Sequence, residues 1–233
     1  MTETKIDTGS HALDSLLHGG ITRSGITSIY GEAGTGKTTI ALQIARQTTM
    51  QGLKVLYVDS DRSFTQQRFQ QMTGANFHSL SELVLLFFPE DFEEQRVLFE
   101  SLENFLTPTV GLVVVDSMSS LYRVAFSSTN DSIFKLNRVL SRQLAYLSEL
   151  SITRKIACLI TSQVHARLTG PIAQIEPVAR RALFHFPKSI IRLRNTPSSN
   201  VKECIVERDE GMDVSNRRCI LALTNEGFTD LQK

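Results

Sequence analysis

The sequence has 233 residues and a mass of 26.1 kDa, with 41% hydrophobic and 21% charged residues. These values are ordinary for a folded globular protein and exclude a disordered chain. No apolar run approaches the roughly 18 residues of a membrane span, and the start of the chain lacks a secretory signal. The three cysteines, Cys158, Cys204 and Cys219, lie among apolar residues, so we expect buried, reduced thiols in a cytoplasmic protein.

The formal net charge of +1 is the sum of two opposite halves. Residues 1–120 hold 8 Lys and Arg against 14 Asp and Glu, and residues 121–233 hold 17 against 10. The halves therefore have net charges of −6 and +7. A near-neutral total argues against a nucleic-acid partner, whereas a basic half can supply a surface for phosphates. Composition leaves open whether these charges bind a partner or are only solvated.

Short apolar runs alternate with amphipathic stretches along most of the chain. The expected strands are residues 26–30, 54–58, 83–88, 111–115 and 156–161. The expected helices are residues 37–50, 66–72, 92–105 and 132–150. This alternation is typical of right-handed βαβ units, which build a mainly parallel, twisted sheet with helices on both faces.

The pattern changes after Pro187. Strand-like runs at residues 189–194, 201–206 and 218–223 have only turns between them. They predict an antiparallel extension at the C-terminal end of the sheet. We therefore expect an α/β fold and a single domain over residues 1–233.

Residues 31–38 match the phosphate-binding pattern G-x-x-x-x-G-K-[ST] in full. The glycines let backbone N–H groups approach phosphate oxygens, and the N-terminus of the following helix adds partial positive charge. We expect Lys37 to reach the β- and γ-phosphates and the Thr38 hydroxyl to bind Mg²⁺. The residues expected to bind ATP here are Gly31, Glu32, Ala33, Gly34, Thr35, Gly36, Lys37, Thr38 and Thr39.

Polar side chains also follow three other expected strands, whose carboxyl ends meet at one edge of a parallel sheet. Asp116 can hold Mg²⁺ or a water bound to it. Of Asp59 and Asp61, one can orient the water that attacks the γ-phosphate, and a strand-end cap is the ordinary alternative for Asp59. Gln163 can sense the γ-phosphate, with a plain loop residue as the alternative.

Motifs along nearly the whole chain resemble the ATPase core of bacterial RecA and of the archaeal and eukaryotic strand-exchange recombinases. The short archaeal RadB proteins are the most similar branch. Residues 6–21 are similar to the family segment that precedes the phosphate loop, and residues 57–68 to the segment with its catalytic glutamate. Residues 112–117, 161–164 and 224–228 resemble the second nucleotide motif, the T-N-Q-V segment and the closing hairpin.

The resemblance implies an ATP- and Mg²⁺-dependent role in DNA repair and homologous recombination. It assigns Lys37, Asp61 and Gln163 to catalysis, and it places Arg68 against adenine. It also implies that Gln163 couples the γ-phosphate to two DNA-binding loops, one near residues 122–131 and one at residues 164–181. The expected DNA contacts are Arg123, Arg167, Arg180 and Arg181, and a merely solvated basic loop is the alternative.

Departures from the family pattern modify this expectation. Asp61 stands where the family has Glu, and the shorter side chain predicts slow hydrolysis. Only five residues precede Ile6, so we expect neither an N-terminal DNA-binding domain nor a polymerisation motif. The family's glycine pair is absent after Pro177, and the proline placed over a neighbour's ATP is not found near residues 210–214. These departures predict DNA binding without autonomous strand exchange.

Two classes of function stay open at this point. One is a recombination accessory protein that binds ATP and single-stranded or branched DNA beside a RadA-type recombinase or a Holliday-junction nuclease. The other is a nucleotide-gated module that docks on such a protein with little DNA contact of its own. A KaiC-like signalling ATPase is a third reading, which the D-S-D-x-x-F segment at residues 59–64 and the closing hairpin disfavour.

Overall fold

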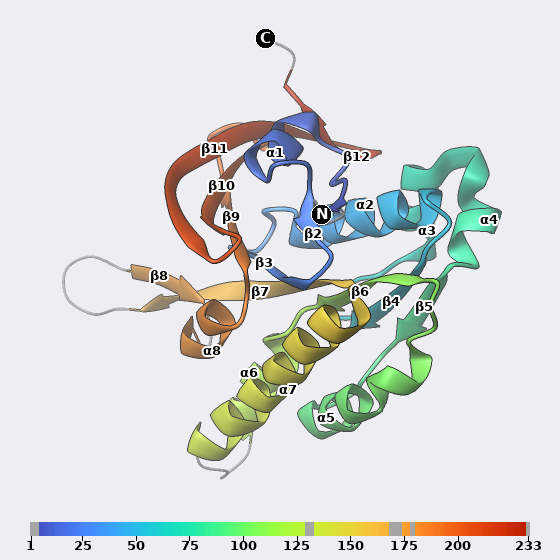
Figure 1. Cartoon of the computed structure of the whole chain (residues 1–233). Coiled ribbons are helices and arrows are strands. Elements are labelled where there is room, and N and C mark those ends of the chain that lie inside the picture. Colours follow the sequence, from blue (N-terminus) through green and yellow to red (C-terminus); the bar gives the residue numbers. More distant parts are fainter. Residues whose placement is uncertain (1–4, 129–132, 168–173, 178–179, 232–233) are drawn as a thin grey trace.

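The computed structural model describes residues 5–128, 133–167, 174–177 and 180–231. A ten-stranded sheet runs through it in the order β12-β11-β10-β9-β3-β7-β6-β4-β5, with β8 paired to β7 beside this path (Figure 1). A separate two-stranded sheet joins β1 (Lys5–Ile6) to β2 (Ile21–Thr22). The large sheet contains strands from both the acidic and the basic half of the sequence.

The centre of the large sheet is parallel, and its C-terminal end is antiparallel, as the sequence predicts. The parallel strands are β3 (Gly25–Gly31), β4 (Lys54–Asp59), β5 (Val84–Phe87), β6 (Val110–Asp116), β7 (Ala157–Arg167) and β9 (Ser189–Asn195). The antiparallel strands are β8 (Gln174–Pro177), β10 (Val201–Asp209), β11 (Met212–Thr224) and β12 (Gly227–Asp230). The expected fold class is confirmed.

Helices cover both faces of the sheet (Figure 1). On one face lie α1 (His11–Leu16), α2 (Lys37–Met50), α3 (Gln66–Thr73) and α4 (Phe77–Ser81). On the other lie α5 (Phe92–Ser101), α6 (Ser120–Ser128), α7 (Ile133–Arg154) and α8 (Arg180–His185). Short 3₁₀ turns follow α3 at Gly74–Asn76 and α5 at Leu102–Phe105.

Each face has its own apolar core, because every central strand sends alternate side chains to opposite sides. In β6, Leu112 and Val114 pack with the α2 side, and Val113 and Val115 pack with the α7 side. All four side chains are fully buried. A strand buried on both faces needs apolar residues throughout, which explains the unbroken apolar run that predicts it.

Several elements are additional to the expected ones or differ in length. The helix expected at residues 92–105 ends at Ser101 and continues as a 3₁₀ turn. The helices α1, α4, α6 and α8 were not expected. Of the three free cysteines, Cys158 and Cys204 are buried as expected and Cys219 is partly exposed. Burial raises the pKa of the Cys158 thiol to about 12.

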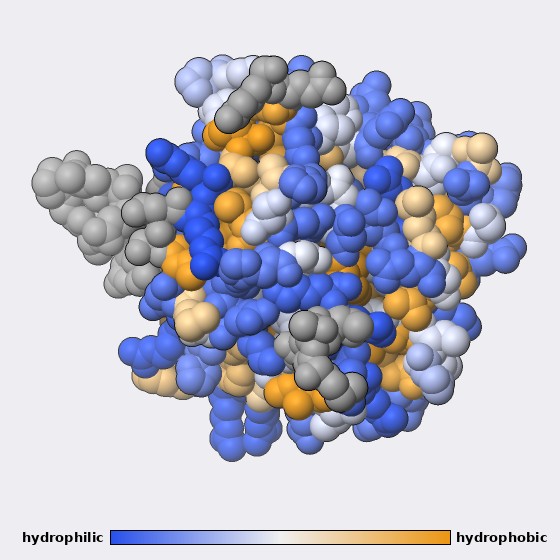
Figure 2. Space-filling model, turned by 45° about the horizontal axis from the view of Figure 1, so that its top comes forward, coloured by the Kyte–Doolittle hydropathy of each residue, from blue (hydrophilic) through white to orange (hydrophobic). Residues whose placement is uncertain are grey.

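The acidic and basic halves of the chain are not two separate regions. Strand β3, from the acidic half, lies between β7 and β9 of the basic half. The helices α1 and α2 pack against β11 and β12. Figure 2 shows a face on which hydrophilic residues predominate and apolar residues lie in separate areas.

The amide of Gln43 in α2 joins the two ends of the described chain. Its nitrogen donates to the carbonyl oxygens of Thr8 at 2.9 Å and Phe228 at 3.1 Å. Its oxygen accepts from the backbone N–H of Phe228 at 2.6 Å. All of these groups are buried, so their hydrogen bonds replace those that water would supply. The helix that follows the phosphate loop is thereby attached to β12.

Candidate nucleotide site

The register of the parallel strands brings the expected site residues to one edge of the sheet. Gly31, at the end of β3, pairs with Gln163 in β7. Asp59, at the end of β4, pairs with Asp116 at the end of β6. Residues that lie more than 50 positions apart in sequence are therefore neighbours at this edge of the sheet. Gln163 does not follow its strand as expected, because β7 continues beyond Thr161 to Arg167.

Three glycines of the phosphate loop have structural reasons to be glycine. Gly34 and Gly36 have φ angles of 74° and 92°, which side chains rarely adopt. A Cβ atom on Gly36 would lie 2.5 Å from the Phe228 ring, and one on Gly31 would lie 2.4 Å from the Leu193 carbonyl oxygen. Strands β9 and β12 thus close around the loop from the C-terminal half of the chain.

The first turn of α2 presents its backbone N–H groups without a side-chain cap. Gly36 is the N-cap residue, and no side chain accepts a hydrogen bond from this turn. By contrast, the hydroxyl groups of Ser10 and Thr65 cap α1 and α3. Uncapped N–H groups at a helix N-terminus suit a phosphate. The loop therefore fits the anionic group that its sequence pattern predicts.

Lys37 lies over this loop. Its Nζ donates to the carbonyl oxygens of Gly31 at 3.0 Å and Glu32 at 2.7 Å. Burial lowers the pKa of Lys37, and the negative charges of Asp116, Asp61 and Glu32 oppose that shift. The ammonium group therefore lies within electrostatic reach of both carboxylates that the sequence assigns to catalysis and Mg²⁺ binding.

Asp116 is 2% exposed and is surrounded by hydroxyl groups. The Tyr57 hydroxyl donates to its Oδ2 at 3.0 Å, and the Thr161 hydroxyl donates to its Oδ1. Burial raises the pKa of Asp116, whereas hydrogen bonds from Thr161, Thr38 and Tyr57 lower it. Thr38 and Asp116, the two residues expected to bind Mg²⁺, are therefore neighbours, and their oxygen atoms suit that ion.

The two aspartates after β4 have different surroundings. Asp59 is fully buried and accepts from the backbone N–H groups of Ser63 at 3.0 Å and Phe64 at 2.8 Å. This is the strand-end cap that the sequence offers as the ordinary alternative for Asp59. The side chain of Asp61 is exposed, and among the described residues it has no hydrogen bond or ion pair. Asp61 is thus the carboxylate that is available to a water molecule.

The Gln163 amide contacts an arginine that the sequence assigns to DNA. Arg123 Nη1 donates to Gln163 Oε1 at 2.9 Å. The neighbouring Tyr122 donates from its hydroxyl to Asn137 Oδ1 in α7 at 2.8 Å. The expectation of a loop near residues 122–131 is wrong as far as Ser128, because these residues form α6 and bury Tyr122 against α5 and α7. Residues 129–132 lie outside the described chain.

The second expected DNA loop, residues 164–181, also contains regular structure. Strand β7 continues to Arg167, pairs with β8, and is followed by α8 from Arg180. The side chains of Arg167 and Arg180, and residues 168–173 and 178–179, lie outside the described part of the structure. Arg181 is exposed and lines a groove of about 650 Å³ between α7 and α8, together with Phe134 and His185.

Arg68, expected to stack on adenine, lies beside the β11–β12 turn. Its guanidinium donates to the carbonyl oxygens of Asn225 at 2.7 Å and Thr224 at 3.1 Å. Sequence reasoning did not assign Tyr57, Thr161 or Phe228 to the site. The available signal was a hydroxyl group within an otherwise apolar strand, which Tyr57 and Thr161 both provide.

Comparison with known proteins agrees with this geometry. The family model described as Rad51 matches residues 2–231. The chain is 35% identical over 184 residues to the DNA repair and recombination protein RadB of Methanococcoides burtonii, with 79% of this chain and 80% of that protein covered. The RadB protein of Thermococcus gammatolerans is 35% identical over 206 residues, with 87% and 89% covered. The chain belongs to the Rad51 family, among its RadB proteins.

A solved structure supports the same placement. A crystal structure of the RadB recombinase superposes with a TM-score of 0.80 at 32% identity, and the match covers 97% of this chain and 100% of that one. Proteins of the Rad51 family are in general ATPases that bind ATP with Mg²⁺. RadB membership favours the recombinase branch over a signalling ATPase. In the described residues, no helix is long and apolar enough to cross a membrane.

The burial of Asp116 predicts a pH-dependent gain in stability for Asp116→Asn. The pKa of Asp116 is raised in the folded state, so its ionisation costs stability as pH rises from the ordinary carboxyl range, about pH 4, toward the raised value. Asn stays neutral and avoids that cost. Urea unfolding of both proteins should give similar free energies near pH 4 and a more stable variant near pH 7. A variant that loses stability relative to the natural protein as pH rises contradicts this account.

Proposed function

We propose that this RadB chain is an ATP-binding, slowly hydrolysing accessory protein of homologous recombination. It binds single-stranded or branched DNA and does not carry out strand exchange by itself. The observation that supports this proposal is the meeting of five groups at one sheet edge. These groups are the uncapped loop before α2, Lys37, the Thr38–Asp116 pair, Asp61 and the Gln163–Arg123 contact.

Each residue has a chemical role in the proposed reaction. The N–H groups of residues 31–39 and the Lys37 ammonium hold the phosphates in place of water. Thr38 and Asp116 hold Mg²⁺, which neutralises charge on the phosphate oxygens when it is bound. Asp61 orients the attacking water and accepts its proton, and Gln163 contacts the γ-phosphate. Arg68 holds the adenine side of the site together with the β11–β12 turn.

The length of the Asp61 side chain supports slow turnover. It is one methylene shorter than the glutamate found in the resembling recombinases. An attacking water held by a shorter carboxylate lies away from the in-line position, and such displacements reduce the rate strongly. Binding of ATP depends on other residues and is retained.

The DNA side of the proposal depends on the basic half of the chain. Arg123 is bonded to Gln163, so a change at the γ-phosphate alters the position of a cation on α6. Arg181 is exposed on α8, beside the strands that continue from Gln163. Arginines in these positions suit phosphates of a DNA backbone. A RadA-type recombinase or a Holliday-junction nuclease is the proposed protein partner.

We also propose that residues 1–233 act as one ATPase domain. Strands from both halves of the chain pair in the same sheet, and Gln43 bonds to both the N-terminal segment and β12. Because these contacts join the two halves of the chain, we expect both halves to unfold in one cooperative transition. No helical DNA-binding domain is needed for the nucleotide chemistry described above.

Lys37→Ala should abolish tight ATP binding, because no other described ammonium group lies over the phosphate loop. Binding of a fluorescent ATP analogue in the presence of Mg²⁺ measures this, and we expect at least about a hundredfold weaker affinity. Lys54→Ala, at the exposed start of β4, is the matched control and should bind normally. Equal affinity for the Lys37→Ala variant and the natural protein would refute the assignment of the site.

Asp61→Glu should raise the rate of ATP hydrolysis by about tenfold, because the longer side chain brings its carboxylate nearer to the attacking water. A single-turnover assay with saturating ATP measures the chemical step without product release. Affinity for ATP should stay unchanged, since Asp61 does not contact the loop that binds the phosphates. A rate equal to or below that of the natural protein rejects side-chain length as the cause of slow turnover.

A further inference from the structure

Two of the three cysteines lie directly opposite each other in the C-terminal part of the large sheet. Cys204 in β10 pairs with Cys219 in β11, and the two strands are antiparallel. The side chains of opposite residues in such a pair lie on the same face, with Cα atoms about 4.5 to 5.5 Å apart. A disulfide spans about 4.4 to 6.8 Å between Cα atoms, so the strand pairing gives the separation that a bond between these two sulfur atoms requires.

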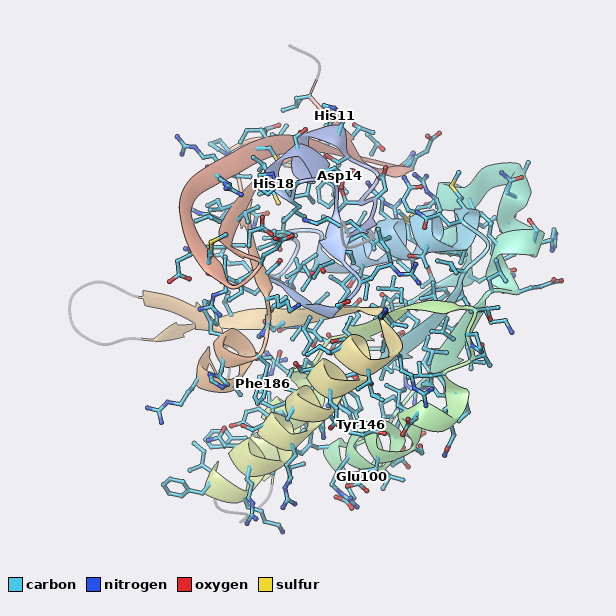
Figure 3. All side chains as sticks on the ribbon, in the orientation of Figure 1. His11, Asp14, His18, Glu100, Tyr146 and Phe186 are labelled. Atoms are coloured by element: carbon cyan, nitrogen blue, oxygen red, sulfur yellow. The ribbon has the colours of Figure 1, made fainter. Side chains whose placement is uncertain are left out.

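The two thiols differ in their access to solvent. Both side chains contact the apolar core on the side of the sheet that α1 and α2 cover. Cys204 is fully buried, whereas Cys219 is partly exposed. Helix α1 packs on β11 on this side, and the labels of His11 and Asp14 mark its place in Figure 3. A small oxidant in solution therefore reaches Cys219, while Cys204 lies protected beside it.

The interaction between the two thiols makes Cys219 the more reactive one. Their hydrogen bond raises the pKa of Cys204, which burial raises further, and lowers the pKa of Cys219. Burial and the charge of Asp230 oppose the shift in the pKa of Cys219 without cancelling it. The thiolate is the form of cysteine that attacks oxidants. The partly exposed cysteine is therefore also the one that ionises more easily.

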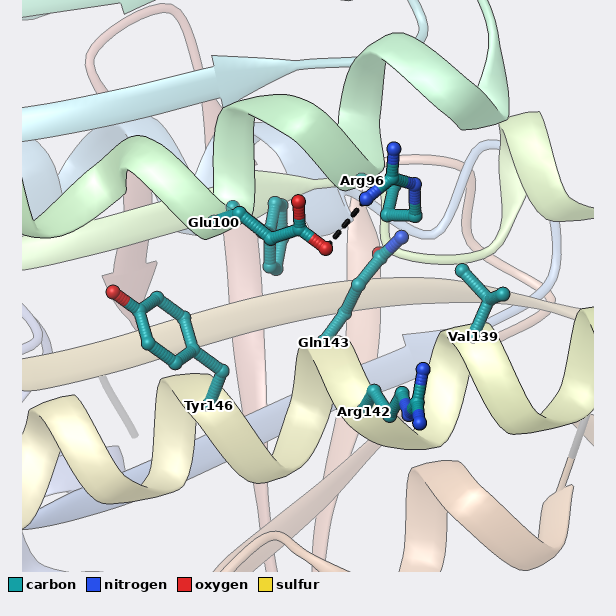
Figure 4. A pocket seen from close by; sticks show the side chains of 7 residues that line it. Arg96, Glu100, Val139, Arg142, Gln143 and Tyr146 are labelled. Carbon is teal, nitrogen blue, oxygen red and sulfur yellow. Dashed lines mark hydrogen bonds and ion pairs between the residues drawn. The ribbon is translucent and has the colours of Figure 1, made fainter.

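Cys158, the third cysteine, has neither a cysteine neighbour nor access to solvent. It is 1% exposed, its thiol donates to the Leu147 carbonyl oxygen at 3.8 Å, and burial raises its pKa to about 12. A groove of about 370 Å³ between α5 and α7 (Figure 4) is lined by Gln143, which accepts from Gln95 Nε2 at 2.7 Å, but not by Cys158. Cys158 is therefore an internal control for the reactivity of the other two cysteines.

We propose that Cys204 and Cys219 are a peroxide-reactive pair that forms a reversible disulfide. The Cys219 thiolate attacks the terminal oxygen of a hydroperoxide, the O–O bond breaks, and the leaving oxygen takes up the proton that Cys219 released. Cys219 is then a sulfenic acid. The Cys204 sulfur attacks the Cys219 sulfur, the S–O bond breaks, and the hydroxyl group leaves as water with the Cys204 proton. The two thiols supply the two electrons that reduce one hydroperoxide, and a low-molecular-weight thiol restores both cysteines by exchange.

The pair lies between the strands that close around the phosphate loop. Strand β10 pairs with β9 through Cys204 and Leu193, and the carbonyl oxygen of Leu193 packs at Gly31. Strand β11 continues through a turn into β12, which packs Phe228 against the loop. The disulfide therefore joins the neighbour of β9 to the neighbour of β12. No residue of the proposed nucleotide chemistry takes part in the reaction, so it does not depend on the ATPase function.

The test uses the reduced natural protein and hydrogen peroxide, with free glutathione in the same sample to show that the oxidant is active. Trypsin cuts between the cysteines, so each lies on its own peptide. After the remaining thiols are alkylated, mass spectrometry should find the Cys204 and Cys219 peptides joined, with the loss of two hydrogen atoms, and Cys158 still a thiol. Dithiothreitol should separate the joined peptides.

Four results would overturn the proposal. The first is unreacted Cys204 and Cys219 after glutathione has been oxidised. The second is Cys219 oxidised to sulfinic acid while Cys204 remains a thiol. The third is a disulfide between two chains, which non-reducing electrophoresis detects as a dimer, and the fourth is oxidation of Cys158 as fast as that of Cys219.

Single variants assign the two roles within the pair. In Cys204→Ala, the sulfenic acid of Cys219 has no thiol to attack it, so dimedone, which labels sulfenic acids, should trap it. In Cys219→Ala, Cys204 should stay an unlabelled thiol because it is fully buried. Cys158→Ala is the matched control and should form the disulfide at the natural rate. Dimedone on Cys204 in Cys219→Ala contradicts the assigned roles, and the linkage in the natural protein decides the proposal if a buried substitution unfolds the chain.

Discussion

The parallel pairing of β3, β7, β6 and β4 is the constraint on which the nucleotide site depends. Parallel strands in one sheet end at the same edge, so Gly31 lies beside Gln163 and Asp59 lies beside Asp116. These pairs bring together the phosphate loop, the proposed Mg²⁺ ligands and the proposed γ-phosphate sensor, although these residues lie far apart in the sequence. The C-terminal strands then close the site, because Phe228 and the Leu193 carbonyl pack against loop positions where only glycine fits.

Local sequence patterns were sufficient for the central strands and for the phosphate loop. The residues of a strand buried on both faces follow one another in sequence, and so do the eight residues of the phosphate loop. The apolar run and the residue spacing therefore reveal them. The donors to Asp116 were not predictable in this way. Tyr57 and Thr161 lie 59 and 45 residues from it, and only the strand register brings them close. The Gln95–Gln143 pair depends in the same way on the packing of α5 against α7.

The same reasoning explains why the DNA segments were predicted less well. The family resemblance implied a loop after Asp116, but the apolar spacing of Leu121, Tyr122 and Ala125 packs α6 against α5 and α7. As a helix, α6 holds Arg123 against Gln163 at a fixed distance, which a loop would not do. The acidic and basic halves of the chain are likewise not cleanly divided in the sheet, because β3 of the acidic half lies between β7 and β9 of the basic half.

The central claim is that nucleotide and DNA are bound by one connected set of residues, joined at Gln163 and Arg123. Its most direct test is the affinity of the natural protein for single-stranded and branched DNA, measured with ATP, with ADP and without nucleotide over a series of salt concentrations. We expect the tightest binding with ATP and a steep loss of affinity as salt rises. The same affinity in all three nucleotide states, or no binding at low salt, would contradict it.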